Sequence, residues 1–397
     1  MPVRTVAIVG AGIAGLTAAL AFARKGVAVD IIEKAPALEE VGAGIQIFPN
    51  ASAVLDRLGV LPALEKLWFE PDRILLVSGS SLKPVSSVPS GTFARQRWHM
   101  PHGVLHRATL QSTLLAAVQA NPLCRLYLDQ QLDATSEADI VAVTGRVPDL
   151  VVGADGVWSA LRRTVPGAKA PRFSGNMAIR FVLDSATGAT VFDPTCVTAL
   201  LGAKTHIVAY PLRETNAFNL VAILQGGGDA RSWFRSMSAS DLKAALAAFS
   251  NWDPAIQHLL ATAPNPTSWP LFQVADGPWH VGPSTVLIGD AAHAMTPFAA
   301  QGAAMAIEDA FELAAFATGT GPLALALAAF EQHRRARIAK VRARGAFNRF
   351  VYHARGPVRV ARDIVLSMRP PETLASDLDW LYGYRALDEA PVSTPQH

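Results

Sequence analysis

The chain has 397 residues, a formal net charge of +3, 50% hydrophobic residues and 17% charged residues. This composition excludes a disordered chain, which combines low hydrophobicity with high charge, and the length suits about two or three domains. Two cysteines, Cys124 and Cys196, are too few for a disulfide framework or a zinc ribbon and indicate a reducing compartment. We therefore expect a cytoplasmic protein without a signal peptide, a membrane span or a nucleic-acid-binding surface.

A strand, a helix and a second strand open the chain. Thr5–Val9 is a short, β-branched apolar run, as in strands that are buried on both faces of a parallel sheet. Leu16–Arg24 is rich in helix formers, and Val27–Ile32 is again a strand-like run. These three segments predict a βαβ unit with a right-handed crossover.

The turn between the first strand and the helix has the glycine spacing of a dinucleotide-binding fingerprint. Gly10 permits a tight turn, Gly12 permits close approach of a pyrophosphate, and Gly15 permits helix–sheet packing. Glu33 follows the second strand, 18 residues after Gly15, where a carboxylate can accept hydrogen bonds from a ribose. The alternative is a structural glycine-rich turn. We expect a dinucleotide, either NAD or FAD, at this turn.

The remaining elements are predicted from periodicity and from turn residues. The uncharged stretch Leu313–Phe330 is interrupted by Thr318–Pro322, which predicts two short helices. The other predicted elements, in chain order, are a helix capped by Asn50 and ending near Leu58, a strand at 73–78, a helix at 110–118, a strand at 150–152, short strands over 172–225, a helix at 241–249, a strand at 286–288, a helix at 302–316 and a basic helix at 325–344.

Two later motifs decide which dinucleotide binds. Gly153-Ala154-Asp155-Gly156 follows one predicted strand, and Gly289-Asp290-Ala291-Ala292-His293 follows another. Pro297-Phe298-Ala299-Ala300-Gln301-Gly302-Ala303-Ala304 lies just downstream. Together with the N-terminal fingerprint, these motifs resemble the class A flavoprotein monooxygenases, the FAD-dependent aromatic hydroxylases of the p-hydroxybenzoate hydroxylase fold. The resemblance covers almost the whole chain.

The resemblance implies an α/β fold. A discontinuous Rossmann-like FAD-binding domain is expected to carry an inserted β-rich substrate domain and C-terminal helices. On this basis we assign residues 1–72, 94–170 and 280–345 to the FAD-binding domain, 73–93 and 171–279 to the substrate domain, and 346–397 to a C-terminal helical segment with a disordered tail after Pro391.

The resemblance also implies the residues that bind FAD. Asp290 is expected to bind the ribityl chain, Asp155 to lie near the pyrophosphate and the nicotinamide donor, and Arg107 to contact FAD. The helix opening at Gly302, Ala303 and Ala304 is expected to stabilise the anionic reduced flavin. The alternatives are a helix cap for Asp290, a turn residue for Asp155 and a surface ion pair for Arg107. The full predicted cofactor set is Gly10, Gly12, Ala14, Gly15, Glu33, Lys34, Gly44, Arg107, Asp155, Asp290, Pro297, Gly302, Ala303 and Ala304.

Further motifs resemble the subgroup of salicylate hydroxylase, 3-hydroxybenzoate 6-hydroxylase and 6-hydroxynicotinate 3-monooxygenase. They are Gly42–Asn50, Phe173–Gly175, His206–Pro211, Trp269–Leu271 and Asp379–Tyr384. The chain departs from the subgroup twice. The subgroup usually has an arginine shortly after Trp-Pro-Leu, where this chain has Phe272-Gln273-Val274-Ala275-Asp276, and Gly-Arg before the third strand, where this chain has Gly282-Pro283-Ser284-Thr285.

His206 and Tyr210 are the candidate catalytic residues. They are four positions apart in a predicted strand, so both side chains point to one face. The resemblance places them in the active site, where a histidine can deprotonate a phenol and a tyrosine can orient it. The alternative is a packed pair in the sheet. His293 is expected close to the flavin, or in a structural hydrogen bond. A substrate carboxylate needs a cation, and Arg180 and Arg213 are both candidates.

The predicted function is FAD-dependent hydroxylation of a small aromatic substrate, similar to hydroxybenzoate or hydroxynicotinate, with NAD(P)H and O2 and through a flavin C4a-hydroperoxide. The alternatives are an NAD(P)H oxidase or reductase of the same fold, a hydroxylase of a larger phenol or heterocycle, and an FAD-binding regulatory protein.

We expect a monomer or homodimer, and no metal at His99, His102 and His106. Six cations between Arg334 and Arg344 are expected on a solvated helix face, or on an anion-attracting surface.

Overall fold

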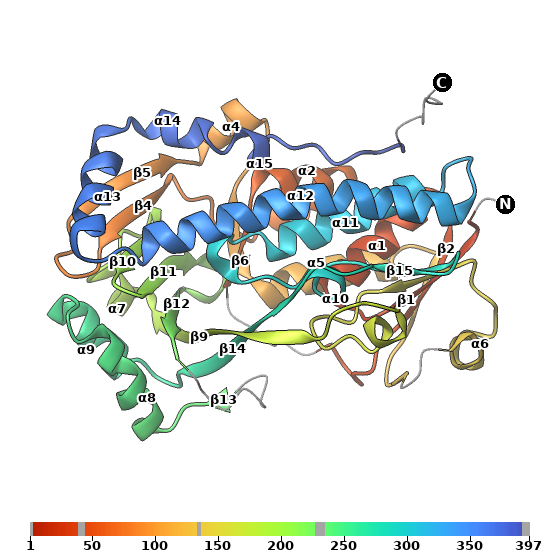
Figure 1. The fold of residues 1–397 in the computed structure, drawn as a ribbon, viewed down its shortest axis with the longest axis horizontal. Helices are drawn as coiled ribbons and strands as arrows, with labels where there is room; N and C mark the ends of the chain where they lie inside the picture. Colours follow the sequence, from red (N-terminus) through yellow and green to blue (C-terminus); the bar gives the residue numbers. More distant parts are fainter. Residues whose placement is uncertain (1–2, 39–43, 133–135, 227–234, 391–397) are drawn as a thin grey trace.

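The computed structural model describes residues 3–38, 44–132, 136–226 and 235–390, and contains two large sheets flanked by helices (Figure 1). The first sheet has the strand order β15-β16-β8-β1-β2-β7, with parallel pairing from β16 to β7. The predicted strand at Thr5–Val9 and its βαβ unit are confirmed. The strands are β1 (Thr5–Val9), β2 (Ala28–Ile32), β7 (Cys124–Tyr127), β8 (Leu150–Gly153), β15 (His280–Val281) and β16 (Thr285–Leu287).

Helix α1 (Ile13–Arg24) approaches the end of β1 closely at Gly15, which carries no side chain. A Cβ atom at Gly15 would lie 1.9 Å from the carbonyl oxygen of Gly10, so only glycine allows this close contact. The helix is buried over most of its length and also packs against α11 (Gly302–Ala317) and α5 (Arg107–Gln119). Gly15 therefore acts in packing, as the fingerprint predicts.

The second sheet has eight strands in the order β13-β14-β9-β12-β11-β10-β4-β5. Its pairings are antiparallel except for β4 with β10. The prediction of only short strands is wrong for β9, a strand of 14 residues that pairs with both β12 and β14. The strands are β4 (Arg73–Ser78), β5 (Pro84–Pro89), β9 (Pro171–Asp184), β10 (Cys196–Gly202), β11 (Thr205–Leu212), β12 (Ala217–Gln225), β13 (Arg235–Ser236) and β14 (Thr267–Val274).

Strands β3 (Gly44–Ile47) and β6 (Gly103–His106) form a two-stranded sheet, and β6 contacts β11 of the second sheet. The prediction that Asn50 caps the next helix is wrong. Asn50 lies inside this helix, and Phe48 is its N-cap. The remaining helices are α2 (Pro49–Arg57), α3 (Leu61–Glu65), α4 (Thr92–Trp98), α6 (Glu137–Thr144), α7 (Ser185–Ala189), α8 (Ala239–Leu246), α9 (Pro254–Thr262), α10 (Asp290–His293), α13 (Gly356–Met368), α14 (Pro371–Ser376) and α15 (Asp379–Tyr382).

Helices α11 and α12 (Leu323–Tyr352) hold the two sheets together. The predicted break at Thr318–Pro322 separates them, but they are long, with 16 and 30 residues, and α12 runs along much of the molecule (Figure 1). The domain boundary that we expected after residue 345 falls inside α12. Within the described ranges, no helix combines the length and the apolar character that a membrane crossing requires.

The cations of α12 were expected on a solvated face, and this is wrong for Arg334 and Arg337. Arg334 is fully buried and pairs with three carboxylates of α11, at 3.0 Å from Glu308, 2.7 Å from Asp309 and 3.0 Å from Glu312. Arg337, 7% exposed, also binds Glu308, at 2.8 Å. We refer to Arg334, Arg337, Glu308, Asp309 and Glu312 as the arginine–carboxylate cluster. Its signal in the sequence is the acid spacing at 308, 309 and 312, which places three carboxylates toward one neighbour.

Replacing Arg334 by Met should destabilise the protein strongly, because three buried carboxylates would lose their shared cation. Removing one partner of a buried ion pair typically costs about 3–5 kcal/mol. Arg335→Met, on the exposed side of the same helix where Arg335 binds Glu331, should cost less than about 1 kcal/mol. Urea unfolding of the FAD-loaded variants measures both changes, and equal losses would contradict the importance of the cluster.

Candidate active site

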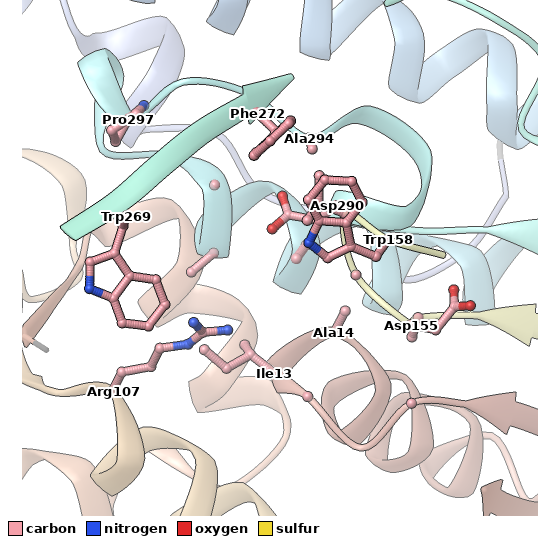
Figure 2. Close-up of a pocket in the computed structure, with 18 of the residues that line it drawn as sticks. Ile13, Ala14, Arg107, Asp155, Trp158, Trp269, Phe272, Asp290, Ala294 and Pro297 are labelled. Carbon is pink, nitrogen blue, oxygen red and sulfur yellow. The ribbon is translucent and has the colours of Figure 1, made fainter. Parts of the chain in front are cut away.

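A cavity of about 680 Å³ lies where the two sheets meet. One end is formed by the carboxyl ends of β1, β2 and β8 and by the first residues of α1 and α11. The other end is formed by one face of β9, β11, β12 and β14. Figure 2 shows residues from both ends around this space, with Asp155 and Asp290 toward one side and Trp269 and Arg107 toward the other.

Two helix N-termini face the cavity without a side-chain cap. Gly12 is the N-cap of α1 and Gln301 is the N-cap of α11, and neither helix has an acidic residue in its first turn. A Cβ atom at Gly12 or at Gly302 would meet nothing within 4 Å. Free N–H groups and open space at a helix N-terminus form a site for an anion such as a pyrophosphate.

The turn after β1 is held against the turn after β8. Gly10 has φ = +105°, and a Cβ atom there would lie 2.6 Å from the carbonyl oxygen of Ala154. Asp155, the next residue, accepts a hydrogen bond from Ala160 N at 2.7 Å through Oδ2. Its Oδ1 is buried and has no hydrogen-bond partner among the described residues. Asp155 thus lines the cavity and keeps one acceptor oxygen without a partner among the described residues.

Glu33 organises the end of β2. Its carboxylate accepts hydrogen bonds from Ala11 N at 2.7 Å and from Ala35 N at 3.0 Å, and the residue lines the cavity next to Lys34. Each carboxylate oxygen has a second acceptor position. Glu33 can therefore bind a ribose while it holds the glycine-rich turn.

Hydrogen bonds to buried side chains hold the turn that carries Asp290. Gly289 N donates to Asp309 Oδ2 at 2.9 Å, and Arg162 donates to the carbonyl of Ala291 at 3.0 Å. His293, expected close to the flavin, is only 2% exposed and binds Asp309 through Nε2 at 2.5 Å. It does not line the cavity. His293 thus has the structural role that was the alternative.

The cavity gathers most of the predicted site residues. Two of them do not line it: Gly15, which packs α1 on the sheet, and Ala304, which is 1% exposed inside α11. Gly42 and Ala43 of the GAGIQIFPN motif, and the expected tail after Pro391, lie outside the described residues. The predicted residues that line the cavity are Gly10, Gly12, Ala14, Glu33, Lys34, Gly44, Arg107, Asp155, His206, Tyr210, Asp290, Pro297, Gly302 and Ala303.

His206 and Tyr210 lie on the same face of β11 and line the end of the cavity formed by the second sheet. His206 is 2% exposed, and its Nδ1 lies 2.9 Å from Nε2 of His353. Burial first, and then the electrostatic effect of the neighbouring His353, lowers the pKa of His206 well below its usual value. His206 is therefore a neutral imidazole at neutral pH.

Arg180 lines the same end of the cavity, and Arg213 does not, because Arg213 is exposed on a short 3-10 turn. The Arg180 guanidinium lies 4.6 Å from the centre of the Trp269 ring. Burial lowers the pKa of Arg180 to about 10, so the group remains a cation at neutral pH. Its Nε is buried without a partner, and no carboxylate of the described residues forms an ion pair with it.

Tyr210 packs against β3 at Gly44. A Cβ atom at Gly44 would lie 2.5 Å from the Tyr210 ring, and Gly44 N donates to Asn219 Oδ1 at 3.0 Å. Burial raises the pKa of the Tyr210 phenol, and the charge of Arg180 opposes this rise. Tyr210 thus carries its proton at neutral pH and can donate a hydrogen bond into the cavity.

The two stretches that depart from the subgroup lie at the cavity and in a turn of the first sheet. Phe272, the first residue of the stretch Phe272–Asp276, lines the cavity and contacts Trp158 edge-on at 4.6 Å between ring centres. Gly282–Ser284 forms the turn between β15 and β16. The cavity wall is therefore aromatic where this stretch begins.

The three histidines at 99, 102 and 106 are separated. His99 is exposed, His102 is buried with Nδ1 2.9 Å from Ser90 Oγ, and His106 caps α5. In the described ranges, no three metal-ligating side chains form a group.

Comparison with known proteins agrees with this geometry. A family model described as FAD binding domain matches residues 4–344. The 3-hydroxybenzoate 6-hydroxylase 1 of Aquipseudomonas alcaligenes is 33% identical over 394 residues, covering 96% of this chain and 98% of the relative. The salicylate hydroxylase of Pseudomonas putida is 33% identical, covering 96% and 92%. A solved salicylate hydroxylase substrate complex has a TM-score of 0.78 at 22% identity, covering 98% and 99%.

The chain belongs to the FAD-binding-domain family, among the FAD-dependent aromatic hydroxylases. The geometry of this hydroxylase fits FAD, because the two uncapped helix ends and the open space at Gly12 face one cavity, which the carboxylate-bearing residues Glu33, Asp155 and Asp290 also line. NAD(P)H is the electron donor typical of such hydroxylases. The sequence motifs missed His353, since nothing near it in the sequence marks a contact with β11.

Replacing Gly12 by Ala should reduce FAD affinity without affecting the fold. The added methyl meets no protein atom within 4 Å, yet it points into the space expected for the pyrophosphate. Overpacking of about 1–3 kcal/mol would lower FAD affinity by roughly ten- to hundredfold. FAD titration and thermal unfolding of the apoprotein measure the two effects. Gly321→Ala, in an equally open turn between α11 and α12, is the matched control. FAD affinity equal to wild type would contradict the assignment.

Proposed function

We propose that this hydroxylase acts on a small phenolic ring that carries an acid group. His206 accepts the proton of the ring hydroxyl, Tyr210 orients that hydroxyl, and Arg180 binds the acid group. FAD is proposed to lie at the other end of the cavity, on the predicted cofactor residues. When bound and reduced by NAD(P)H, FAD supplies the chemistry that transfers oxygen to the ring.

The observation that carries this proposal is the partly buried guanidinium of Arg180, which has no ion-pair partner among the described residues. A cation at an apolar wall is costly unless an anion neutralises it. Val221 lies directly opposite Arg180 on β12, and Val208 and Ile223 line the same cavity; none of these apolar side chains can do so. A carboxylate on the substrate supplies the missing charge, and the Trp269 ring limits the positions that the guanidinium can adopt.

The strand register places His206 and Arg180 at opposite ends of a ring-sized space. His206 on β11 is paired with Ile223 on β12, and Arg180 on β9 is paired with Val221 on β12. The two residues are thus two strands apart, roughly 10 Å across the sheet. An aromatic ring with substituents on two sides fits between them, which favours a hydroxybenzoate-like acid.

His206 suits the role of base because it is neutral and held by a hydrogen bond. A phenol reacts faster with an electrophilic oxygen donor once its hydroxyl has lost a proton, and a positioned base typically contributes about 10²–10⁴-fold. When Nδ1 of His206 donates to His353, its Nε2 is the free acceptor. Tyr210, protonated and on the same strand face, donates to the same hydroxyl oxygen.

The proposal is tested with pairs of acid and amide. The FAD-loaded enzyme is assayed with NADH against salicylate, 3- and 4-hydroxybenzoate and 6-hydroxynicotinate, each beside its carboxamide, with product and peroxide both quantified. One acid should be hydroxylated with little peroxide and be preferred over its amide. Arg180→Gln should raise KM for that acid roughly ten- to hundredfold, the value of one charge-assisted hydrogen bond, and leave KM for the amide near wild type.

Arg213→Gln is the matched control and should leave both KM values unchanged, because Arg213 is exposed away from the cavity. An equal KM change for acid and amide would contradict the role of Arg180. Peroxide equal to the NADH consumed, with every acid, would contradict hydroxylation of hydroxy acids. It would favour the oxidase alternative, or a larger phenol or heterocycle as substrate.

A further inference from the structure

We propose that His353 is the second member of a proton pathway that carries the hydroxyl proton of the substrate from His206 to a second cavity. This inference rests on the proposed function, since it needs a substrate that loses a proton at His206. His353 does not line the active-site cavity. It is therefore a positioning and relay residue, which acts only through His206.

The contact between the two imidazoles supplies the connection. Nδ1 of His206 lies 2.9 Å from Nε2 of His353, a normal hydrogen-bond distance between ring nitrogens. Phe298 and Tyr352 pack against the His206 ring at 5.4 and 5.3 Å between ring centres, so the ring cannot turn away easily. The two histidines come from β11 and from the residue after α12, and the long helix thus reaches into the active-site wall.

A second cavity, of about 900 Å³, lies on the other side of the pair. His353 lines this cavity, whereas His206 lines only the first. Ala294 and Met295 line both cavities, so the wall between the two is one layer of residues thick at this point. The histidine pair therefore crosses the wall that separates the substrate from the second cavity.

The cations around the second cavity disfavour a positively charged His353. A proton that reaches His353 is therefore released and not held. Lys204 on the β10–β11 turn, Arg349 on α12 and Arg355 after α12 all line it. Arg342 also lines it and is paired with the exposed Asp276. Burial first, and then the charge of Arg349, lowers the pKa of His353 to about 4. Because neither imidazole holds a positive charge at neutral pH, a proton that enters the pair must leave it.

The transfer conserves every proton. The O–H bond of the substrate breaks and an Nε2–H bond forms on His206. The Nδ1–H of His206 passes to Nε2 of His353, and the Nδ1–H of His353 passes to solvent water in the second cavity. Both rings are neutral before and after the transfer, and each changes from the Nδ1–H tautomer to the Nε2–H tautomer. Nδ1 of His353 is buried and makes no hydrogen bond with the described residues, so the last step needs a small rotation of this partly exposed ring toward the second cavity.

The decisive variant is His353→Gln. A glutamine amide can still accept a hydrogen bond from Nδ1 of His206, but it cannot pass a proton from one atom to another. With the acid that the wild-type enzyme hydroxylates best, we expect kcat to fall at least about tenfold, within the range of a lost base, while KM stays near wild type. His258→Gln, at an exposed histidine of α9, is the control and should leave both constants unchanged.

A substrate that is already ionised separates proton transfer from structural damage. A ring-fluorinated analogue of the same acid, with its hydroxyl ionised at the assay pH, has no proton to lose. The loss of kcat in His353→Gln should largely disappear with this analogue. A His353→Gln enzyme as fast as wild type, or an equal loss with both substrates, would overturn the proposal.

A measurement without turnover tests the pair independently of the proposed function. FAD-loaded protein labelled with ¹⁵N-histidine should show two neutral, hydrogen-bonded rings from about pH 6 to pH 8, identified by their loss in His206→Gln and His353→Gln. A positively charged ring at pH 7 in either residue would overturn the relay. If no acid in the panel is hydroxylated but both rings are neutral and bonded, the proposed function fails and the pair itself stands.

Discussion

The fold of this hydroxylase depends on a buried ion cluster between two helices. Arg334 of α12 binds Glu308, Asp309 and Glu312 of α11, all fully buried. The second oxygen of Asp309 accepts from Gly289 N, directly before Asp290. The cluster thus links the long helix to the turn that carries a predicted FAD ligand. Since charges without partners are costly in the interior, these elements can adopt few other arrangements.

The same helices connect the two ends of the active site. The N-terminus of α11 faces the cofactor end of the cavity, while α12 runs on to the second sheet, where His353 meets His206 (Figure 1). The second sheet provides a mostly apolar face whose few polar groups include His206 and Tyr210 of β11 and Arg180 of β9. A rigid sheet positions such groups more accurately than loops do. Binding of the cofactor and binding of the substrate therefore rest on one packed unit.

The sequence predicted those features that depend on residues close together in the chain. Thr5–Val9, the glycine-rich turn and Glu33 form one local pattern, and the structure has it. Asn50, read as a helix cap, instead donates to Gln301 and Glu308, more than 250 residues away. Arg334, read as solvated, has its partners on another helix. Their roles depend on long-range packing, which spacing along one helix does not encode. The choice between Arg180 and Arg213 likewise required the strand register.

In the proposed complex, the acid group of the substrate lies at Arg180 and its hydroxyl at His206, with FAD beyond them. A crystal structure of the FAD-loaded protein with its best acid substrate tests this most directly. We expect the carboxylate within about 3 Å of the Arg180 guanidinium, and the hydroxyl oxygen within hydrogen-bond distance of His206 Nε2 and Tyr210 Oη. A ring bound in the reverse direction, or a carboxylate paired with Arg107 while Arg180 stays unpaired, would contradict the account.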